Sequence, residues 1–382
     1  MGATLDETAL VRTFAGRRVL VTGHTGFKGG WLSLWLSRLG ATVVGVALPP
    51  TRPSFCTAVD IENLIGSRIG DIRTESGLRE AIGELDFDLV IHLAAQAIVR
   101  TSYEAPVDTY MTNVVGTAVV LEAARRMPSL RGVIVVTSDK CYANGEWVWP
   151  YRENDPMGGR DPYSSSKGCA ELVAAAYRAS FFSDAGGAQL ATVRAGNVIG
   201  GGDWGSDRLV ADLARSASTG TPARIRNPGN VRPWQHVLEP IRGYLMLGAG
   251  LLDHGRSFAG AWNFGPSADA DVNVGTLADL ALSRWRGECP DYLVERQEGE
   301  PPESVVLRLD STKSRVELGW KPLLRLDEAV AMTIDWYRAY CREPHRMRAF
   351  SDQQISEYAM RWAATNEATP MHGQGMRDAS CA

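Results

Sequence analysis

Short apolar runs alternate with longer amphipathic stretches through the first half of the chain. Five of these runs are apolar at consecutive positions, which is typical of parallel strands with both faces buried. They cover residues 17–22, 42–47, 88–94, 132–138 and 191–195. The alternation predicts an α/β fold with a Rossmann-type, doubly wound parallel sheet flanked by helices.

The stretch after the first run has helical periodicity. Its apolar residues recur at spacings of four, three, one and four, which places them on one helix face. They are Phe27, Trp31, Leu34, Trp35 and Leu39. The first strand is therefore expected to lead through a turn into a helix.

The second half of the chain is less regular. Glycine and proline become frequent after residue 200, and the next clear helical pattern covers residues 326–340. A length of 382 residues exceeds what one compact core usually holds. We therefore expect a Rossmann domain interleaved with a smaller C-terminal substrate domain. The expected ranges are 1–198 with 233–266 for the Rossmann domain, 199–232 with 267–365 for the substrate domain, and 366–382 for a flexible tail.

Charge and hydropathy exclude several classes of partner. The net charge of −4 gives no basic field for nucleic acid or an anionic membrane, so neither is expected as a partner. No window approaches the roughly 18 apolar residues of a membrane helix, and the first 17 residues lack the apolar run of a signal peptide. We expect a cytoplasmic protein.

The six cysteines are widely scattered. They form no CxxC pair and no Cys/His spacing that suits zinc, so we expect reduced thiols and no metal site. They are Cys56, Cys141, Cys169, Cys289, Cys341 and Cys381.

A glycine-rich loop separates the first strand from its helix. Gly23, Gly26 and Gly29 are spaced three apart in TGHTGFKGGW, residues 22–31. Such a loop lets the backbone approach a pyrophosphate, and the helix N-terminus then offers free N–H groups to the anion. The context predicts a dinucleotide site, to which Lys28 adds a cation unless its side chain is solvated.

The second strand leaves the choice between NAD and NADP open. No acidic residue follows Ala47 to hold the ribose hydroxyls, and the chain continues LPPTRPS. Arg52 either accepts a 2′-phosphate, which would favour NADP, or is an exposed loop residue. Asp71 ends another apolar run and is a candidate for the adenine amino group, or a turn residue.

Tyr163 and Lys167 stand four residues apart after Asp161 and Pro162, which suit a helix start. Both side chains can therefore lie on one helix face. A lysine cation there is expected to lower the pKa of the tyrosine, which would make its phenolate available as a base.

Ser138, Asp139 and Lys140 follow the fourth apolar run, at the sheet edge where ligands of open α/β sheets bind. Ser138 can bond a substrate hydroxyl beside Tyr163, while Asp139 and Lys140 supply an acid and an amine base. Lysine is rare here: the 40 basic residues include only five lysines. Because arginine stays protonated and lysine can lose its proton, a lysine kept at position 140 suggests a need for that property. The alternative is a salt-bridged strand end.

The chain resembles the CDP-glucose 4,6-dehydratase family, a nucleotide-sugar branch of the extended short-chain dehydrogenases. The resemblance covers roughly residues 17–340 and is most specific at Asp139-Lys140, where related dTDP- and GDP-sugar dehydratases have Asp-Glu. The segments that carry it are TGHTGFKGGWLSLWL (22–36), HLAAQAIVR (92–100), TSDKCYAN (137–144), ENDPMGGRDPYSSSKGCAE (153–171), RAGNVIGGGDW (194–204) and RPWQHV (232–237).

The resemblance implies tightly held NAD and a CDP-sugar substrate. Tyr163, assisted by Ser138 and Lys167, would take the 4-hydroxyl proton while the C4 hydride passes to NAD. Lys140 would then remove the C5 proton, Asp139 would protonate the leaving 6-hydroxyl, and hydride would return to C6.

The resemblance also implies binding residues on both sides of the reaction. The expected cofactor residues are Gly23, Gly26, Phe27, Lys28, Gly29, Asp71, Ile72, Leu93, Ala94, Ala95, Tyr163 and Lys167. The expected substrate residues are Gln96 near the hexose, Asn197 and Arg232 near the diphosphate, and Arg208 and Arg226 on the nucleotide side. Each arginine could instead form a surface salt bridge, and Trp234 and His236 are interpreted as packing residues.

Other functions stay open at this point. A 4-epimerase would use the same tyrosine and lysine without an acid and base at 139 and 140, and a dehydratase of another nucleotide-activated glucose would share the whole mechanism. A homodimer or homotetramer is expected. The resemblance implies a role in deoxysugar biosynthesis for lipopolysaccharide O-antigen.

Overall fold

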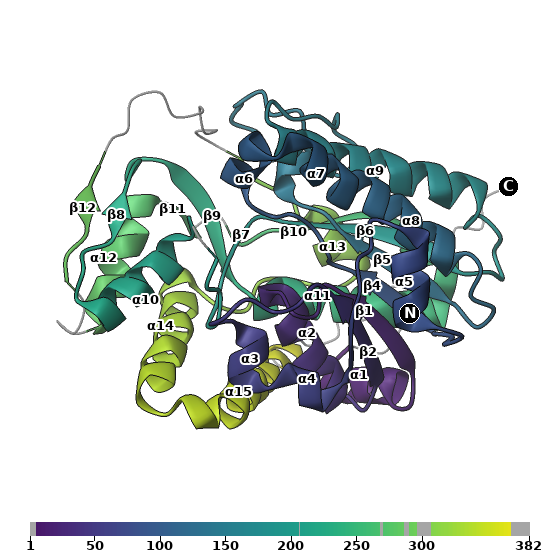
Figure 1. Ribbon diagram of the computed structural model, residues 1–382, viewed down its shortest axis with the longest axis horizontal. Helices are drawn as coiled ribbons and strands as arrows, with labels where there is room; N and C mark the ends of the chain where they lie inside the picture. Colours follow the sequence, from purple (N-terminus) through teal and green to yellow (C-terminus); the bar gives the residue numbers. More distant parts are fainter. Residues whose placement is uncertain (1–4, 206, 268–269, 286–289, 296–306, 368–382) are drawn as a thin grey trace, which may run out of the picture.

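The computed structural model describes residues 5–205, 207–267, 270–285, 290–295 and 307–367. A sheet of seven parallel strands forms its centre, in the order β10-β6-β5-β4-β1-β2-β3 (Figure 1). The strands are β1 Arg18–Thr22, β2 Thr42–Ala47, β3 Gly66–Ile69, β4 Leu89–His92, β5 Gly132–Val136, β6 Gln189–Ala195 and β10 Gly260–Phe264. This order is that of a Rossmann fold with one added strand, so the predicted fold class is confirmed.

The five apolar runs form β1, β2, β4, β5 and β6. Two of them end earlier than the sequence predicts: β4 stops at His92 and β5 at Val136. The residues that follow leave the sheet and line the cavity described below. Strand β3 is not among the five predicted strands. It belongs to the run before Asp71, but GSRI itself lies at the sheet edge and contains a single aliphatic residue.

Both faces of the sheet are covered by helices. In β1, Val19 and Val21 belong to one hydrophobic cluster while Leu20 belongs to the other, as the alternation of side chains along a strand requires. The first cluster contains side chains of α1 Glu7–Phe14, α2 Phe27–Arg38, α3 Phe55–Val59, α4 Ile61–Leu64, α11 Leu238–His254 and α15 Met347–Glu367. The second contains side chains of α5 Glu75–Ile82, α8 Gly116–Ala124 and α9 Pro162–Ser180.

Helix α2 confirms the strand, turn and helix predicted after the first apolar run. Burial of this helix extends beyond the predicted apolar stripe, because Leu32, Ser33 and Leu36 are also buried. The additional cover comes from helices α3, α4, α11 and α15, which pack around it.

A smaller part stands beside the carboxyl ends of the strands (Figure 1). The chain enters it after β6, returns to the large sheet through α11 and β10, and leaves again. Its elements are β7 Asn197–Ile199, α10 Leu209–Thr219, β8 Arg224–Ile225, β9 Val231–His236, β11 Asp271–Asn273, α12 Val274–Trp285, β12 Leu293–Val294 and α14 Leu326–Arg342. Helix α14 confirms the helical pattern predicted at residues 326–340.

The last helix contacts both parts of the molecule. The predicted ranges assign α15 to the substrate domain, and it packs against α14 of the smaller part as well as α1, α2 and α3 of the Rossmann part, for example through the edge-to-face contact of Tyr358 with Trp35. It also continues to Glu367, two residues into the predicted tail, and residues 368–382 lie outside the described part.

Short helical segments complete the described elements. They are α6 Val99–Glu104, α7 Pro106–Tyr110, the π-helix Met111–Val115, α13 Thr312–Glu317, and the 3₁₀ turns Asp139–Cys141, Gly255–Phe258 and Pro344–Arg346. Within the described ranges, no helix combines the length and apolar character that crossing a membrane requires.

Candidate active site

A cavity of about 760 Å³ opens at the carboxyl ends of β1, β4 and β5. Its other wall comes from the smaller part, through segments near residues 196–212 and 224–234. Nearly all predicted site residues line it: Gly23, Gly26, Phe27, Lys28, Gly29, Asp71, Ile72, Leu93, Ala94, Ala95, Ser138, Asp139, Lys140, Tyr163, Lys167, Asn197, Arg208, Arg226 and Arg232. The exception is Gln96.

The glycine loop has the geometry that the sequence predicts. Gly23 has φ +81°, and a Cβ there would lie 2.7 Å from the backbone nitrogen of Ala94. A Cβ on Gly29 would lie 2.1 Å from the carbonyl oxygen of Gly23. Gly26 is the N-cap of α2 and provides no side chain to bond the free N–H groups of the first turn. Those groups are suited to a pyrophosphate.

The adenosine side of the cavity is shaped by Asp71. Its carboxylate accepts hydrogen bonds from Arg73 Nε at 2.8 and 3.1 Å and pairs with Arg73 Nη2 at 2.7 Å. This hydrogen bonding lowers the pKa of Asp71. Arg52 is exposed and is not among the residues that line the cavity, which agrees with its interpretation as a loop residue.

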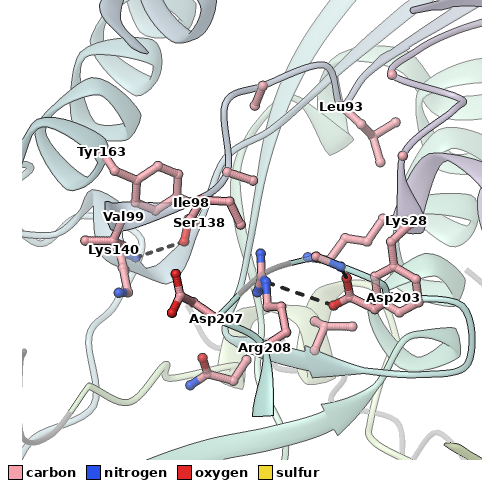
Figure 2. A pocket seen from close by; sticks show the side chains of 18 of the residues that line it. Lys28, Leu93, Ile98, Val99, Ser138, Lys140, Tyr163, Asp203, Asp207 and Arg208 are labelled. Atoms are coloured by element: carbon pink, nitrogen blue, oxygen red, sulfur yellow. Dashed lines mark hydrogen bonds and ion pairs between the residues drawn. The ribbon is translucent and has the colours of Figure 1, made fainter. Parts of the chain in front are cut away.

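Lys28 projects from the first turn of α2 into the cavity (Figure 2). Burial lowers its pKa to about 8, and the nearby charge of Arg208 acts in the same direction. Its side chain is only partly exposed, which excludes the solvated alternative. Three of the five lysines, at 28, 140 and 167, therefore line one cavity.

Tyr163 and Lys167 lie on α9, whose N-cap Asp161 accepts a hydrogen bond from the Ser164 N–H at 2.9 Å and whose first position is Pro162. The phenol of Tyr163 lies close enough to the Ser138 hydroxyl for the serine to oppose the rise of its pKa. Lys167 Nζ donates to the Val136 carbonyl at 3.4 Å. The helix thus places both side chains at the end of β5, as predicted.

The electrostatics of this pair differ from the prediction. Burial raises the pKa of Tyr163, and the largest opposing contributions are the Ser138 hydrogen bond and the charge of Arg208. Burial also lowers the pKa of Lys167 to about 8. The predicted net lowering of the Tyr163 pKa is therefore wrong, because desolvation of the phenolate exceeds the attraction of neighbouring cations.

Asp139 and Lys140 lie in the 3₁₀ turn that follows β5. Ser138 caps this turn by accepting a hydrogen bond from the Lys140 N–H at 3.2 Å. Asp139 is 5% exposed, and burial raises its pKa against the opposing charge of Lys140. Gly196 leaves it room, because a Cβ there would lie 3.2 Å from Asp139 Oδ2. A carboxyl group that stays protonated to higher pH is suited to act as an acid.

Figure 2 shows Tyr163, Ser138 and Lys140 together on one side of the cavity, and Lys28, Asp203 and Arg208 on the other. The reacting groups and the cations that suit a diphosphate therefore face a common space. With a dinucleotide on the glycine loop as hydride acceptor, this arrangement would support oxidation of a hydroxyl, removal of a neighbouring proton and protonation of a leaving group.

Gln96 lies outside this space. Its side-chain amide donates to the Ile98 carbonyl and the Thr109 hydroxyl, both at 3.0 Å, and accepts from the Ile98 N–H. The side chain predicted to lie near the hexose instead shapes the loop after β4, from which Ile98, Val99 and Arg100 line the cavity.

Two aspartates were missed by the sequence analysis. Asp207 pairs with Arg226 at 2.9 Å and with Arg100 at 3.7 Å, and Asp203 pairs with Arg208 at 4.0 Å. All five residues line the cavity. The aspartates occur in the irregular stretch GGGDWGSD, which has no periodicity that could have indicated their position.

Comparison with known proteins agrees with this geometry. Residues 19–258 match the NAD dependent epimerase/dehydratase family. The chain belongs to this family. As a member it is an NAD dependent enzyme, and the glycine loop, Asp71 and Lys167 provide a site that fits the cofactor.

Within the family, the chain is 49% identical over 348 residues to the CDP-glucose 4,6-dehydratase of Salmonella typhimurium, covering 90% of this chain and 96% of that protein. It is 28% identical over 344 residues to the dTDP-glucose 4,6-dehydratase of Streptomyces griseus, covering 84% and 94% of the two chains. The first relative has the activity of the group that the motifs resemble.

Solved structures of family members share the fold. The dTDP-glucose 4,6-dehydratase of Streptomyces venezuelae, solved with NAD bound, has a TM-score of 0.71 at 24% identity and covers 86% of this chain and 99% of its own. The UDP-glucose 4-epimerase of Thermus thermophilus, also solved with NAD, has a TM-score of 0.70 at 23% identity, with coverages of 84% and 99%.

His236 and Trp234, both expected to be packing residues, lie near the site. His236 is buried in the core, where burial lowers its pKa to about 3, and Trp234 donates to the Val272 carbonyl at 3.3 Å. His236 is thus confirmed as a packing residue, whereas Trp234 also lines the cavity.

Cysteines and acidic residues give no sign of a metal site in the described ranges, where no group of three or more His, Cys, Asp or Glu side chains could hold an ion. Cys56, Cys141, Cys169 and Cys341 are free thiols, as predicted. Cys289 and Cys381 lie outside the described residues.

Proposed function

We propose that this enzyme is a CDP-glucose 4,6-dehydratase, which converts CDP-D-glucose to CDP-4-keto-6-deoxy-D-glucose and water. The observation that carries the proposal is the turn in which a buried Asp139, with its raised pKa, precedes Lys140 beside the Ser138–Tyr163 pair. The 49% identity to a CDP-glucose 4,6-dehydratase over most of the chain supports it.

Oxidation at C4 comes first. Tyr163 takes the proton of the sugar 4-hydroxyl, with Ser138 holding the same oxygen by a hydrogen bond. NAD, which the glycine loop, Asp71 and Lys167 would hold, would supply the hydride chemistry at C4 and C6. Protonated Lys167, at the base of the cavity, places a positive charge that favours the phenolate form of Tyr163.

Elimination follows, because the 4-keto group acidifies the proton on C5. Lys140 removes that proton and Asp139 gives its proton to the 6-hydroxyl, which leaves as water. After hydride has reached C6, a proton is returned to C5 to complete the product. The buried carboxyl of Asp139 suits this role, since its raised pKa keeps it protonated over a wider pH range.

The diphosphate is proposed to bind Asn197 and Arg232, with Arg208 and Arg226 toward the nucleotide. Arginine forks match phosphate oxygens in geometry and charge. Asp203 and Asp207 pair with Arg208 and Arg226 and hold these forks at the cavity wall.

A 4-epimerase is the rival within the family, and the solved epimerases share this fold. Incubation of the purified protein with CDP-, dTDP-, GDP- and UDP-glucose distinguishes the two activities. The proposal expects a 4-keto-6-deoxy product that forms fastest from CDP-glucose. CDP-galactose as product, or preference for another nucleotide, would contradict it.

A homodimer is proposed, with its interface on helices α6, α7 and α9. Two such dimers can pair into a tetramer. Large apolar side chains are exposed on these helices and on the π-helix that follows α7, as is typical of a surface covered by a partner. They are Tyr103, Val107, Tyr110, Met111, Val115 and Leu172. Val107→Asp is expected to shift the sedimentation coefficient toward the monomer, and an unchanged oligomer would contradict this interface.

Two further expectations belong to the proposal. The proposed domains, 1–198 with 233–266 and 199–232 with 267–365, would separate cofactor binding from nucleotide binding. A cytoplasmic location and a role in deoxysugar biosynthesis for O-antigen would follow from a nucleotide-sugar substrate.

A further inference from the structure

A buried ion pair lies directly beneath the catalytic turn. Arg194 on β6 donates from Nε to Glu171 Oε1 and from Nη2 to Glu171 Oε2, each at 2.8 Å, and both side chains are 4–5% exposed. The Thr192 hydroxyl donates to the same carboxylate at 2.7 Å. Neither charged residue lines the cavity.

This pair holds both ends of the turn. Thr137, just before Ser138, donates its hydroxyl proton to Glu171 Oε1 at 2.5 Å. Tyr142, just after Cys141, accepts a hydrogen bond from Arg194 Nη1 at 2.6 Å and donates to Asn263 Oδ1 at 2.8 Å. The segment between Thr137 and Tyr142 contains Ser138, Asp139 and Lys140.

The same pair also fixes the catalytic helix. Glu171 lies on α9 one turn after Lys167 and two turns after Tyr163. A single bidentate contact therefore links the helix that carries the oxidation residues to the turn that carries the elimination residues. A change in the geometry of the Glu171–Arg194 ion pair would therefore alter the distance between Tyr163 and Lys140.

That separation matters for chemistry on adjacent carbons. Proton removal at C4 and at C5 must occur on one bound sugar, and a misplacement of about 1 Å can cost ~100-fold in rate. A buried ion pair is weak evidence for a stabilising role, because desolvation offsets much of the attraction. Its connections to both catalytic segments indicate a role in positioning.

We propose that Glu171, Arg194 and Tyr142 are positioning residues that hold the Asp139–Lys140 turn in register with Tyr163 for the elimination step. The inference rests on the proposed dehydratase function. It concerns the second stage of the reaction, since C4 oxidation depends on Tyr163 and Ser138, whose hydroxyls lie near each other.

Tyr142→Phe tests this most cleanly, because it removes only the phenolic hydroxyl, which accepts a hydrogen bond from Arg194 Nη1 and donates one to Asn263 Oδ1. The enzyme with NAD and CDP-glucose is followed in a single turnover, where NADH absorbance rises with C4 oxidation and decays with hydride return. We expect the rise to stay within about 2-fold of the parent and the decay to slow by roughly 10-fold. KM should change little.

Tyr151→Phe is the matched control. Tyr151 stacks on Tyr142 at 5.1 Å and is equally buried, but its hydroxyl bonds Gly145 N and Asn144 rather than the ion pair. Both phases should match the parent in this variant. Equal slowing of both phases by Tyr142→Phe, no slowing of the decay, or the same effect in Tyr151→Phe would overturn the inference.

Thr137→Val provides a second variant should Tyr142→Phe unfold, as judged by circular dichroism. It removes the bond to Glu171 at the other end of the turn and should also slow the decay more than the rise. The parent separates the two proposals: a parent that makes no 4-keto-6-deoxy product refutes the dehydratase function, whereas a productive parent with unaltered Thr137→Val kinetics refutes only the positioning role.

Discussion

Ser138 Oγ donates a hydrogen bond to Oδ1 of Asp139 at 2.9 Å, and its hydroxyl lies beside the Tyr163 phenol. A serine hydroxyl has one proton and two acceptor sites. While that proton points to Asp139, Ser138 can only accept a hydrogen bond from the phenol. Once Asp139 is protonated it can donate to Ser138, which leaves the serine proton for the Tyr163 phenolate.

The acid of the elimination and the base of the oxidation are therefore joined through one hydroxyl. Burial raises the pKa values of both Asp139 and Tyr163. The protonated form of Asp139 is thus the form that best supports ionisation of Tyr163, and it is also the form needed to expel water from C6.

Tyr163→Phe is expected to lower kcat by a factor of at least ~100, since general-base catalysis contributes about that much or more. NAD binding should change little, because only the hydroxyl is removed. Steady-state kinetics and calorimetry measure the two quantities. Tyr177→Phe, on the same helix but in the second hydrophobic cluster, is the control. Turnover within a few-fold of the parent would contradict the role of Tyr163.

Lys140→Arg should keep the charge and lose the elimination. Arginine stays protonated and cannot act as the C5 base. The variant should still reduce bound NAD when CDP-glucose is added, but form no 4-keto-6-deoxy product. In deuterated water, only the parent should place deuterium at C5, as measured by mass spectrometry and NMR. Normal turnover would show that another group or water removes the C5 proton.

The sheet could be predicted because its strands are buried on both faces. Strand β2 matches the predicted residues 42–47, since apolar side chains fill both sides of it. Strand β3 lies at the edge and its side chains are largely exposed, so its sequence has only a weak apolar signal. The packing of α15 against both α14 and helices α1, α2 and α3 could not be predicted, because sequence order does not show which distant helices a terminal helix contacts.

The site could be predicted where residue type and chain position coincide, as in the glycine loop and the Tyr163–Lys167 pair. Gln96 was misplaced because its amide bonds the neighbouring backbone, which spacing does not reveal. The raised pKa of Tyr163 required knowledge of burial. The contacts of Glu171 with Arg194 join residues far apart in sequence and needed the fold.

NAD should bind more tightly than NADP. Asp71 lines the cavity, and its ion pair with Arg73 keeps its carboxylate ionised. The negative charge of Asp71 disfavours a 2′-phosphate nearby. Arg52 is not among the lining residues. Calorimetry with both cofactors measures the preference, and Arg52→Ala should leave it unchanged. Tighter binding of NADP that is lost in Arg52→Ala would instead make Arg52 a phosphate ligand.

Acid should destabilise the fold through three buried histidines. Burial lowers the pKa of His24 to about 4 and those of His92 and His236 to about 3. The unfolded chain, with histidine pKa values of about 6.5, then binds more protons than the native state below that pH. Stability should therefore fall as pH decreases from about 6.5 to about 4, by up to ~1.4 kcal/mol per pH unit for each histidine.

Melting temperatures across this pH range measure the effect. His236→Asn should lower the melting temperature at pH 7.5 but flatten its decrease toward acid, because one of the three protonation sites is gone. His254→Asn serves as the control, since His254 is exposed. An equal acid slope in the parent and in His236→Asn would contradict the burial argument for this residue.

The central claim is that hydride leaves C4 and returns to C6 of the same CDP-sugar. CDP-glucose carrying deuterium at C4 tests it directly, with the product analysed by NMR. The dehydratase account predicts CDP-4-keto-6-deoxyglucose with the deuterium on C6. Deuterium that returns to C4 in a CDP-hexose with its 6-hydroxyl intact would contradict the account and identify an epimerase.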